Sequence, residues 1–380
     1  MKAGRDSTPS ICFVGLNNLS ALAPEFRNHE MGGAQLQQTL LAKALVREGF
    51  QVSMVVADLG QADGAEWHGI RTYKAYRLDA GIPGARFIHP RWTGVWSALR
   101  RANANVNYCS CADVLLGQVA LFNQRHAGNA AFRIAHDFDC QPDKLLIPNW
   151  RGKVLYRYGL RRADLILAQT ATQQAQMKRN FGRNSRVIPS LLEFGADNLD
   201  FAARDIDLLW VSNIRPFKRP DLVLDMGAQI PDLKVRMIGG TQPGFDEYFA
   251  DIRRRALDLP NVAFCGSQPY EAVNQQMARA RLFINTSDSE GFPNTYLQAW
   301  ARGTPVVAFF DPDGVIAREG LGRVVQSVEQ MRSAIRQFLT EPELWSTTSA
   351  RCVHYVSAQH GESAVNAYVD ALLPLATRVQ

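Results

Sequence analysis

The sequence lacks any apolar run long enough to cross a membrane. Its longest uninterrupted apolar stretches, such as 305–310, fall far short of the roughly 20 residues that a spanning helix needs. The run at 11–16 near the N-terminus is too brief for a secretory signal. We therefore expect a cytoplasmic protein, and peripheral contact with the inner face of the cytoplasmic membrane stays open as an alternative.

Cysteine is also scarce, and its spacing argues against a small domain stabilised by disulfides or by zinc. The six cysteines are scattered, and no two of them have Cys-x-x-Cys spacing. Neither a disulfide framework nor a structural zinc site is indicated. We interpret the cysteines as small apolar residues in the core, and we expect no metal and no cofactor.

Acidic residues are few in the first half of the chain. Residues 1–190 contain 24 Lys and Arg against 13 Asp and Glu, whereas the remainder contains 18 against 23. Within 144–186 there are ten basic residues and one acidic residue, with Trp150, Tyr156 and Tyr158 among them. Such a basic half suggests an anionic partner, which could be nucleic acid, an acidic membrane face or a diphosphate-bearing substrate.

Apolar segments alternate in the order that builds parallel sheets. A buried strand is expected at 9–15, and a helix that opens at Gly32-Gly33 leads to a second strand at 51–57. The alternation continues to residue 189, pauses over 191–205 in a segment without periodicity, and resumes at 207. We therefore predict an α/β protein with two doubly wound parallel sheets. Ligands of such sheets bind at the carboxyl ends of the strands, and a cleft between the two domains is the expected site.

One stretch, 284–313, combines a strand, a polar turn with Glu290, a short helix and a further strand. Pro293 suits the first position of the helix, and Gly303 suits its end. The amides at such a helix start point over the carboxyl end of the preceding strand. That arrangement is typical of an anion-binding site, and phosphate is its usual ligand.

The same stretch carries a family resemblance. Glu290-Gly-Phe-Pro-Asn-Thr-Tyr-Leu-Gln298, followed by Gly303-Thr-Pro-Val-Val, resembles the donor-site signature of the group 1 (family four) retaining glycosyltransferases. Other parts of the family pattern also have matches in this sequence, in the same order, so that the resemblance extends over nearly the whole chain. The resemblance implies the GT-B fold, with two Rossmann-like domains facing across a cleft. Residues 1–190, completed by a helix in 360–380, would bind the acceptor, and 191–359 would bind the nucleotide sugar.

The resemblance also implies a role for several side chains. Lys218 and Arg215 would stabilise the leaving diphosphate, and Glu290 would face the transferred sugar. The arginine of the family pattern falls on Asn213, so that Arg215 would supply the guanidinium in its place. The expected substrate-binding residues are Gly32, Gly33, Asn213, Gly291, Phe292, Pro293, Asn294, Thr295 and Gln298. A solvated basic loop and a loop acid beside a helix start are the plainer interpretations.

Two expected contributions come from the first half. Gly32-Gly33 matches the glycine-rich loop that faces the donor phosphates, although a turn that needs positive φ is the plainer interpretation. His136 ends a strand, where the family has a histidine beside the reacting sugar. Asp137 and Asp139 follow it and raise the question of a metal, but no second histidine lies nearby. A structural histidine is the alternative.

Gln298 departs from the family pattern, which has a second glutamate there. An amide keeps a carbonyl acceptor for a ribose hydroxyl but cannot act as a carboxylate nucleophile. This disfavours a double displacement and favours a front-face route in which the leaving diphosphate deprotonates the acceptor.

We predict a metal-independent retaining glycosyltransferase that uses a nucleotide sugar and a glycan or glycolipid acceptor, with no nucleic-acid partner. The acceptor would be a lipid-linked or polysaccharide-precursor glycan. A sugar-nucleotide epimerase or hydrolase of the same fold and a non-catalytic sugar-nucleotide-binding subunit are the alternatives.

Overall fold

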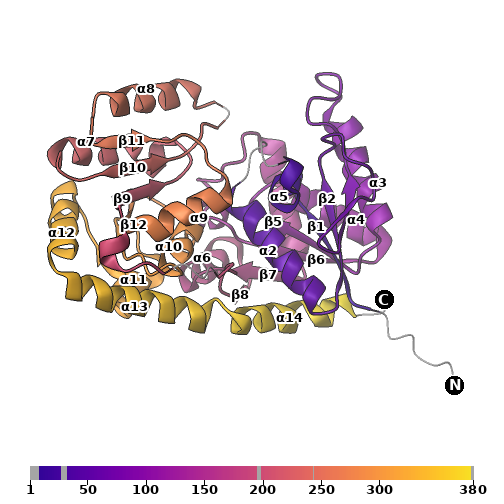
Figure 1. The fold of residues 1–380 in the computed structure, drawn as a ribbon. Helices are drawn as coiled ribbons and strands as arrows, with labels where there is room; N and C mark the ends of the chain where they lie inside the picture. Colours follow the sequence, from indigo (N-terminus) through magenta and orange to yellow (C-terminus); the bar gives the residue numbers. More distant parts are fainter. Residues whose placement is uncertain (1–7, 27–31, 195–197, 243, 378–380) are drawn as a thin grey trace. The chain divides into compact units, whose positions relative to one another are not determined.

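The computed structural model describes residues 8–26, 32–194, 198–242 and 244–377 (Figure 1). The chain divides into two compact units. The first comprises Met1–Leu191 together with Glu362–Gln380, and the second comprises Leu192–Gly361. No helix within the described ranges has both the length and the apolar character needed to cross a membrane.

The first unit is built on an eight-stranded sheet with the order β3-β4-β2-β1-β5-β6-β7-β8. All neighbouring strands are parallel except β3, which pairs antiparallel with β4. The strands are β1 (Ser10–Val14), β2 (Gln51–Val56), β3 (Glu66–Trp67), β4 (Ile70–Lys74), β5 (Val106–Ser110), β6 (Asn129–Arg133), β7 (Leu165–Ala168) and β8 (Arg186–Val187). The strands expected at 9–15 and 51–57 are present as β1 and β2, and the sequence pattern did not predict β3.

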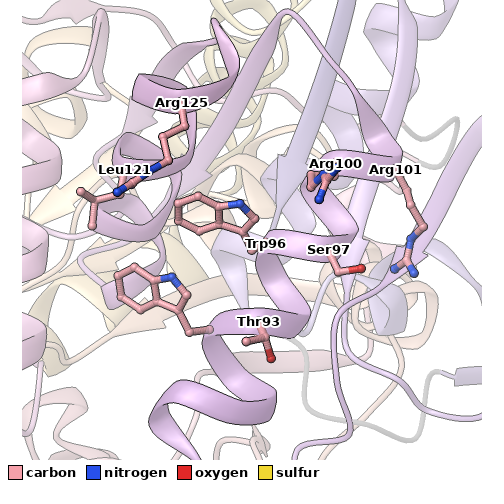
Figure 2. Close-up of a pocket in the computed structure, with 8 residues that line it drawn as sticks. Thr93, Trp96, Ser97, Arg100, Arg101, Leu121 and Arg125 are labelled. Atoms are coloured by element: carbon pink, nitrogen blue, oxygen red, sulfur yellow. The ribbon is translucent and has the colours of Figure 1, made fainter.

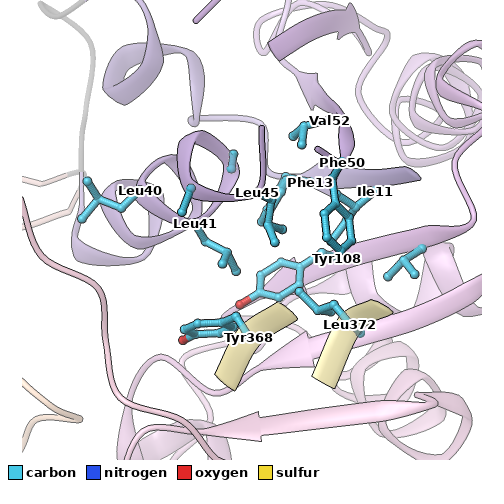
Figure 3. Close-up of a cluster of buried hydrophobic side chains, with 14 of the residues drawn as sticks. Ile11, Phe13, Leu40, Leu41, Leu45, Phe50, Val52, Tyr108, Tyr368 and Leu372 are labelled. Atoms are coloured by element: carbon cyan, nitrogen blue, oxygen red, sulfur yellow. The ribbon is translucent and has the colours of Figure 1, made fainter. Parts of the chain in front are cut away.

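Helices cover both faces of this sheet because its strands are apolar on both sides. Ile11 and Phe13 of β1 pack in one cluster with α2 (Gly33–Arg47) and α14 (Glu362–Ala376) (Figure 3). Cys12 and Val14, which point the other way, pack with α3 (Thr93–Ala102), α4 (Val114–His126) and α5 (Trp150–Arg162). Side chains alternate between the two faces along a strand, so this sheet needs two separate helix layers.

The shorter helices and the edges of this unit differ in detail from the sequence pattern. The segment Phe87–Trp92 leads into α3, and its backbone departs from helical geometry at His89, with φ −127° and ψ 126°. The segment after β1 includes the short helix α1 (Leu19–Leu22) and a 3₁₀ turn at Pro24–Phe26, and residues 27–31 lie outside the described part. Helix α6 (Ala171–Phe181) ends at Gly182, whose φ of +66° is left-handed.

The last helix of the chain, α14, belongs to the first unit. Tyr368 and Leu372 are buried against α2 and β5. The Asn129 side chain donates a hydrogen bond of 2.9 Å to the carbonyl of Leu375. The Arg133 guanidinium also lies 5.4 Å from the centre of the Tyr368 ring. Part of the core of this unit is therefore contributed by residues from the other end of the sequence.

The second unit has a six-stranded, wholly parallel sheet with the order β11-β10-β9-β12-β13-β14. Its strands are β9 (Ile206–Val211), β10 (Val235–Ile238), β11 (Val262–Phe264), β12 (Ala280–Asn285), β13 (Val306–Ala308) and β14 (Gly322–Val324). Its helices are α7 (Pro220–Gln229), α8 (Asp246–Leu257), α9 (Tyr270–Arg279), α10 (Asn294–Trp300), α11 (Val315–Glu319), α12 (Val328–Thr340) and α13 (Pro342–Gln359). The sequence pattern did not predict α11 or β14.

The order of this sheet reverses between β9 and β12. From β9 the chain first proceeds to β10 and β11 on one side, and then returns to β12, β13 and β14 on the other. The carboxyl ends of the two strands at such a reversal leave a crevice between diverging loops, and open α/β sheets bind their ligands there. The loops 212–219 and 286–293 follow these two strands.

Candidate active site

The candidate active site of the second unit lies where the loops after β9 and β12 meet. The strands pair in parallel, with Leu208 opposite Leu282, so that their carboxyl ends reach the same edge of the sheet. The backbone N–H of Asp288 donates to the carbonyl of Phe217 at 2.9 Å. This bond connects the two loops directly, although they are far apart in sequence.

Lys218 and Glu290 form an ion pair at this edge, 72 residues apart in the sequence. Both side chains are largely buried, with 13% and 11% of their surfaces exposed. The Ser287 hydroxyl donates to the other carboxylate oxygen of Glu290 at 2.7 Å. A charge pair shielded from water in this way interacts more strongly than an exposed pair and is held in a defined geometry.

A buried threonine positions the backbone of Lys218. The indole N–H of Trp210 donates to Thr286 Oγ1 at 3.0 Å, and the Thr286 hydroxyl donates to the carbonyl of Lys218 at 2.8 Å. The two bonds connect β9, the first loop and the end of β12. Thr286 and Ser287 were not among the predicted site residues. Their place directly after a buried strand and just before Glu290 is the signal that could have identified them.

The loop 212–219 also places Arg215 beside two aromatic rings. Its guanidinium lies 5.9 Å from the ring centres of both Phe217 and Phe245. The turn at Pro216–Lys218 closes with a hydrogen bond of 3.0 Å from the Lys218 N–H to the carbonyl of Arg215. Asn213, two residues before Arg215, is half-buried in the same loop.

Arg219 ends this loop in the left-handed region, at φ +50°. Its guanidinium pairs with Asp221 at 3.1 Å and with Asp288 of the second loop at 3.6 Å. Arg219 thus forms a second connection between the two loops, beside the one formed by Phe217 and Asp288.

The helix that follows Glu290 begins one residue later than predicted. Pro293 is the N-cap, with ψ 121°, and α10 starts at Asn294. Phe292 is buried, and its ring centre lies 6.2 Å from that of Trp300. The helix ends at Trp300 with Ala301 as its C-cap, earlier than predicted, and Gly303 ends the turn that follows it with φ +63°. Gly291 is buried, and Thr295 is half-buried in the first turn of α10.

Gln298 faces the neighbouring helix α9. Its side-chain amide donates a hydrogen bond of 2.8 Å to the side-chain oxygen of Asn274, and 5% of the residue is exposed. Burial raises the pKa of Tyr296 on the same helix well above its ordinary value, and the nearby Glu290 carboxylate adds to that shift. The Tyr296 hydroxyl therefore remains a donor, here to the carbonyl of Phe310 at 2.8 Å.

In the first unit, Gly32 and Gly33 open α2. Gly32 has φ −120°, so the plainer interpretation of a turn that needs positive φ is wrong for this residue. Its N–H donates to the Gln35 side-chain oxygen at 3.2 Å, which caps the start of the helix. The glycine is thus not required by its backbone conformation.

His136 lies just beyond the carboxyl end of β6. Its Nδ1 accepts a hydrogen bond of 3.1 Å from the N–H of Phe138, which fixes the orientation of the ring. The Asp139 carboxylate accepts from the N–H groups of Ala135 and His136 at 2.8 and 3.1 Å. Burial raises the pKa of Asp139 to about 6, although these bonds oppose the shift. Asp139 thus positions the histidine segment, a role that the sequence pattern does not predict.

The structure thus gathers most of the predicted residues at one edge of the second sheet. Lys218 and Glu290 form their ion pair there and Arg215 lies in the same loop as Lys218, whereas the glycine pair and His136 belong to the first unit. Among the described residues, no cluster of three or more His, Cys, Asp or Glu side chains could hold a metal ion.

Comparison with known families covers both units. A family model described as "Glycosyl transferase 4-like domain" matches residues 32–190, and one described as "Glycosyl transferases group 1" matches residues 205–341. Together the two matches cover well over half of the chain. The chain belongs to the group 1 glycosyltransferases. The second match includes the whole edge occupied by Arg215, Lys218 and Glu290.

Among curated proteins, this group 1 glycosyltransferase is similar to the D-inositol 3-phosphate glycosyltransferase of Mycobacteroides abscessus. The two are 35% identical over 103 residues, which is 26% of this chain and 23% of that protein. Matches to further proteins of that description span 36% and 55% of their lengths. The chain therefore spans between about a quarter and about half of the length of the curated relatives it matches.

Solved structures confirm the fold predicted for this group 1 glycosyltransferase. HepE of Anabaena, solved in complex with UDP and glucose, is 17% identical with a TM-score of 0.75, over 96% of this chain and 99% of that one. WaaG, a glycosyltransferase involved in lipopolysaccharide biosynthesis, is 14% identical with a TM-score of 0.69, over 95% and 99%. At these identities the likeness shows the GT-B fold with its two Rossmann-like domains.

Proposed function

We propose that this group 1 glycosyltransferase transfers a sugar from a nucleotide-activated donor to a glycan acceptor, with retention of anomeric configuration and without a metal. The observation that carries the proposal is the Lys218–Glu290 pair, which is held at the carboxyl edge of β9 and β12 where the sheet order reverses. The complex of HepE with UDP and glucose supports a nucleotide-sugar donor for this fold.

The cation has a defined task in this reaction. The bond between the anomeric carbon and the diphosphate oxygen breaks, and its electron pair stays on the nucleoside diphosphate. An ammonium group has three N–H donors, of which one contacts Glu290, so the others can bind phosphate oxygens. The Arg215 guanidinium adds a planar fork suited to the same oxygens. Preorganised donors of this kind act where negative charge develops, and the loss of one costs roughly 10²–10³ in rate.

The carboxylate would act on the donor sugar. Glu290 is held on one oxygen by Ser287 and on the other by Lys218, so its orientation is set before any ligand binds. The carboxylate can accept hydrogen bonds from sugar hydroxyls and stabilise positive charge at the anomeric carbon. The backbone of Gly291 to Thr295 at the start of α10 would contact the sugar and the phosphates.

The proposed retention follows a single front-face displacement. Gln298 carries no charge and is bonded to Asn274, so it offers no second carboxylate for a covalent intermediate. The acceptor hydroxyl would attack from the face that the diphosphate leaves. Its proton would pass to a phosphate oxygen as the new bond between carbon and oxygen forms.

In the first unit we propose that Gly32 and Gly33 bind phosphate through their backbone, and that His136 binds sugar hydroxyls. The acceptor would be a lipid-linked or polysaccharide-precursor glycan, and the part that WaaG has in lipopolysaccharide biosynthesis supports this class. Peripheral contact with an anionic membrane is supported by the basic helices of this unit, and no nucleic-acid partner is proposed. The helices α3, α4, α5 and α6 contain basic residues and no acidic ones.

The test incubates the purified protein with a panel of nucleotide sugars and measures nucleotide release with and without membrane extract. Release that depends on the extract supports transfer. Release without extract supports an epimerase or hydrolase, and binding without turnover supports a non-catalytic subunit. Either of these last two results would overturn the proposal.

The Lys218→Ala variant tests the assigned cation. We expect it to lower turnover by roughly 10²–10³ while the protein stays folded, because the leaving diphosphate loses a preorganised donor. Lys234→Ala is the matched control, since Lys234 is exposed and lies just before β10, at the opposite edge of the same sheet. Equal activity of the two variants would refute the role of Lys218.

A further inference from the structure

A groove of about 910 Å³ runs along the outer side of α3 and α4 in the first unit (Figure 2). Trp92 and Trp96 line it together with Leu121 and the side chains of Arg100, Arg101 and Arg125. Its volume lies near the upper end of the roughly 300–1,000 Å³ that is usual for small-molecule sites. The groove therefore has room for several sugar units.

The two tryptophans form a fixed aromatic platform. Their ring centres are 6.3 Å apart, and their planes are inclined by 24°. Phe122 of α4 packs edge-on against Trp96 with ring centres 5.4 Å apart, and Phe87 lies 5.8 Å from Trp92. Aromatic rings supported in this way lose little conformational entropy when a ligand covers them.

The charge around the platform is positive and largely uncompensated. Arg100 and Arg125 form no ion pair with any carboxylate among the described residues, and the Arg125 guanidinium lies 5.7 Å from the centre of the Trp96 ring. Arg101, in contrast, is held by Asp63 at 3.5 Å. Figure 2 shows Arg125 and Arg100 on either side of Trp96. The groove thus offers two guanidinium groups next to flat apolar surfaces.

We propose that this groove binds an anionic oligosaccharide, which would be an already assembled part of the acceptor. The apolar face of a pyranose ring packs well on an indole, and a guanidinium fork matches a carboxylate, sulfate or phosphate substituent. This inference rests on the proposed glycosyltransferase function and specifies the acceptor as acidic.

The shape of the groove favours a soluble glycan chain over a membrane surface. Trp92 and Trp96 are half-buried in a hollow, whereas a membrane contact needs apolar side chains that project. The projecting Trp150, with 70% of its surface exposed, lies on α5 and does not line the groove. An anionic membrane is therefore the rival outcome of the test.

The groove extends to the sheet edge opposite to His136. Arg100, Arg101 and Arg125 lie in the last turns of α3 and α4, which lead into the starts of β5 and β6. His136 follows the carboxyl end of β6. A glycan in the groove would therefore be bound through sugar units that are remote from the units beside His136.

The test measures binding of oligogalacturonates of defined length by calorimetry, with malto-oligosaccharides of the same length as neutral probes and no donor present. We expect binding of the acidic series, with a Kd about tenfold weaker for the Arg100→Gln/Arg125→Gln double variant and for Trp92→Ala. The control double variant Lys178→Gln/Arg179→Gln removes the same charge from exposed positions on α6 and should bind as the wild type does. Thermal unfolding of each variant checks that it is folded.

Four results would overturn the inference. The first is equal binding of the acidic and neutral probes, and the second is binding of neither. The third is that the control variant weakens binding as much as the test variant does. The fourth is binding to anionic phosphatidylglycerol vesicles without binding to oligogalacturonate. Because no donor is used, these results are separate from the nucleotide-release test of the proposed function. If the protein binds the acidic series but releases no nucleotide, the inference about the groove is supported and the proposed transferase function is contradicted.

Discussion

Thr286 offers the sharpest test of how the site is held together. In Thr286→Val the side chain keeps its shape but loses its hydroxyl. Both hydrogen bonds of that hydroxyl disappear, namely the one it accepts from Trp210 Nε1 and the one it donates to the carbonyl of Lys218. Thr286 and Trp210 are each 1% exposed, so the indole N–H is left without a partner where water cannot reach it.

The expected cost follows from this burial. An unsatisfied buried donor costs about 1–3 kcal/mol, and the second lost bond adds about 0.5–1.5 kcal/mol. We therefore expect the second unit to lose about 2–4 kcal/mol of stability. In a unit of this size each kcal/mol shifts the Tm by about 2–4 °C, so its unfolding transition should fall by about 5–15 °C. Turnover below that transition should also fall, since the backbone of Lys218 is no longer fixed.

The assay is thermal unfolding followed by nucleotide release at a temperature where every variant is folded. Thr286→Ser is the matched control, because it keeps the hydroxyl and loses only a methyl group. We expect it to retain most of the activity. If Thr286→Val unfolds and turns over like Thr286→Ser, the hydroxyl does not position Lys218 and the reasoning is wrong.

Two further predictions concern Glu290 and Asp139. Ser287→Ala removes the hydrogen bond to Glu290 Oε1. We expect kcat to fall about tenfold while the protein stays folded. An effect on stability alone would contradict the role of Ser287 in orienting Glu290. For Asp139, burial raises the pKa from 3.8 to about 6, so its favourable contribution is complete below about pH 4 and is lost as the pH rises through about 6. Relative to Asp139→Asn, the wild type should therefore lose about 3 kcal/mol of unfolding free energy between about pH 4 and 7. Parallel pH profiles in denaturant unfolding would contradict the shift.

The sequence predicted long, strongly patterned elements well and short ones poorly. The helix α2 and buried strands such as β1 and β9 carry enough periodic positions to be recognised. The two-residue β3, the three-residue β14 and the five-residue α11 carry too few. Their existence depends on neighbouring strands and on packing. The start of α10 differed by one residue because the fixed φ of Pro293 suits an N-cap as well as the first turn.

The segment 191–205 contains a buried charge that the sequence pattern does not predict. It has no periodicity, yet Arg204 near its end is 1% exposed. Its guanidinium donates to the Thr304 hydroxyl at 2.7 Å and, through its Nε, to the carbonyl of Leu199 at 2.8 Å, and it lies 4.7 Å from the centre of the Trp345 ring. Burial lowers the pKa of this arginine to about 10. Thr304 and Trp345, which are distant in sequence, contribute to making this buried position tolerable for a charge.

The sequence by itself determined the two-sheet plan and the chemical types at the site. The alternation of strands and helices requires parallel sheets, and the motif at 290–307 carries the family resemblance together with Lys218. Which groups touch was decided by tertiary structure alone. Lys218 and Glu290 meet because β9 and β12 pair, and their positions are fixed by Thr286 and Ser287, which no pattern singled out. Hydrogen bonds depend on distances of a few ångströms in space, and the separation of two residues along the chain does not determine that distance.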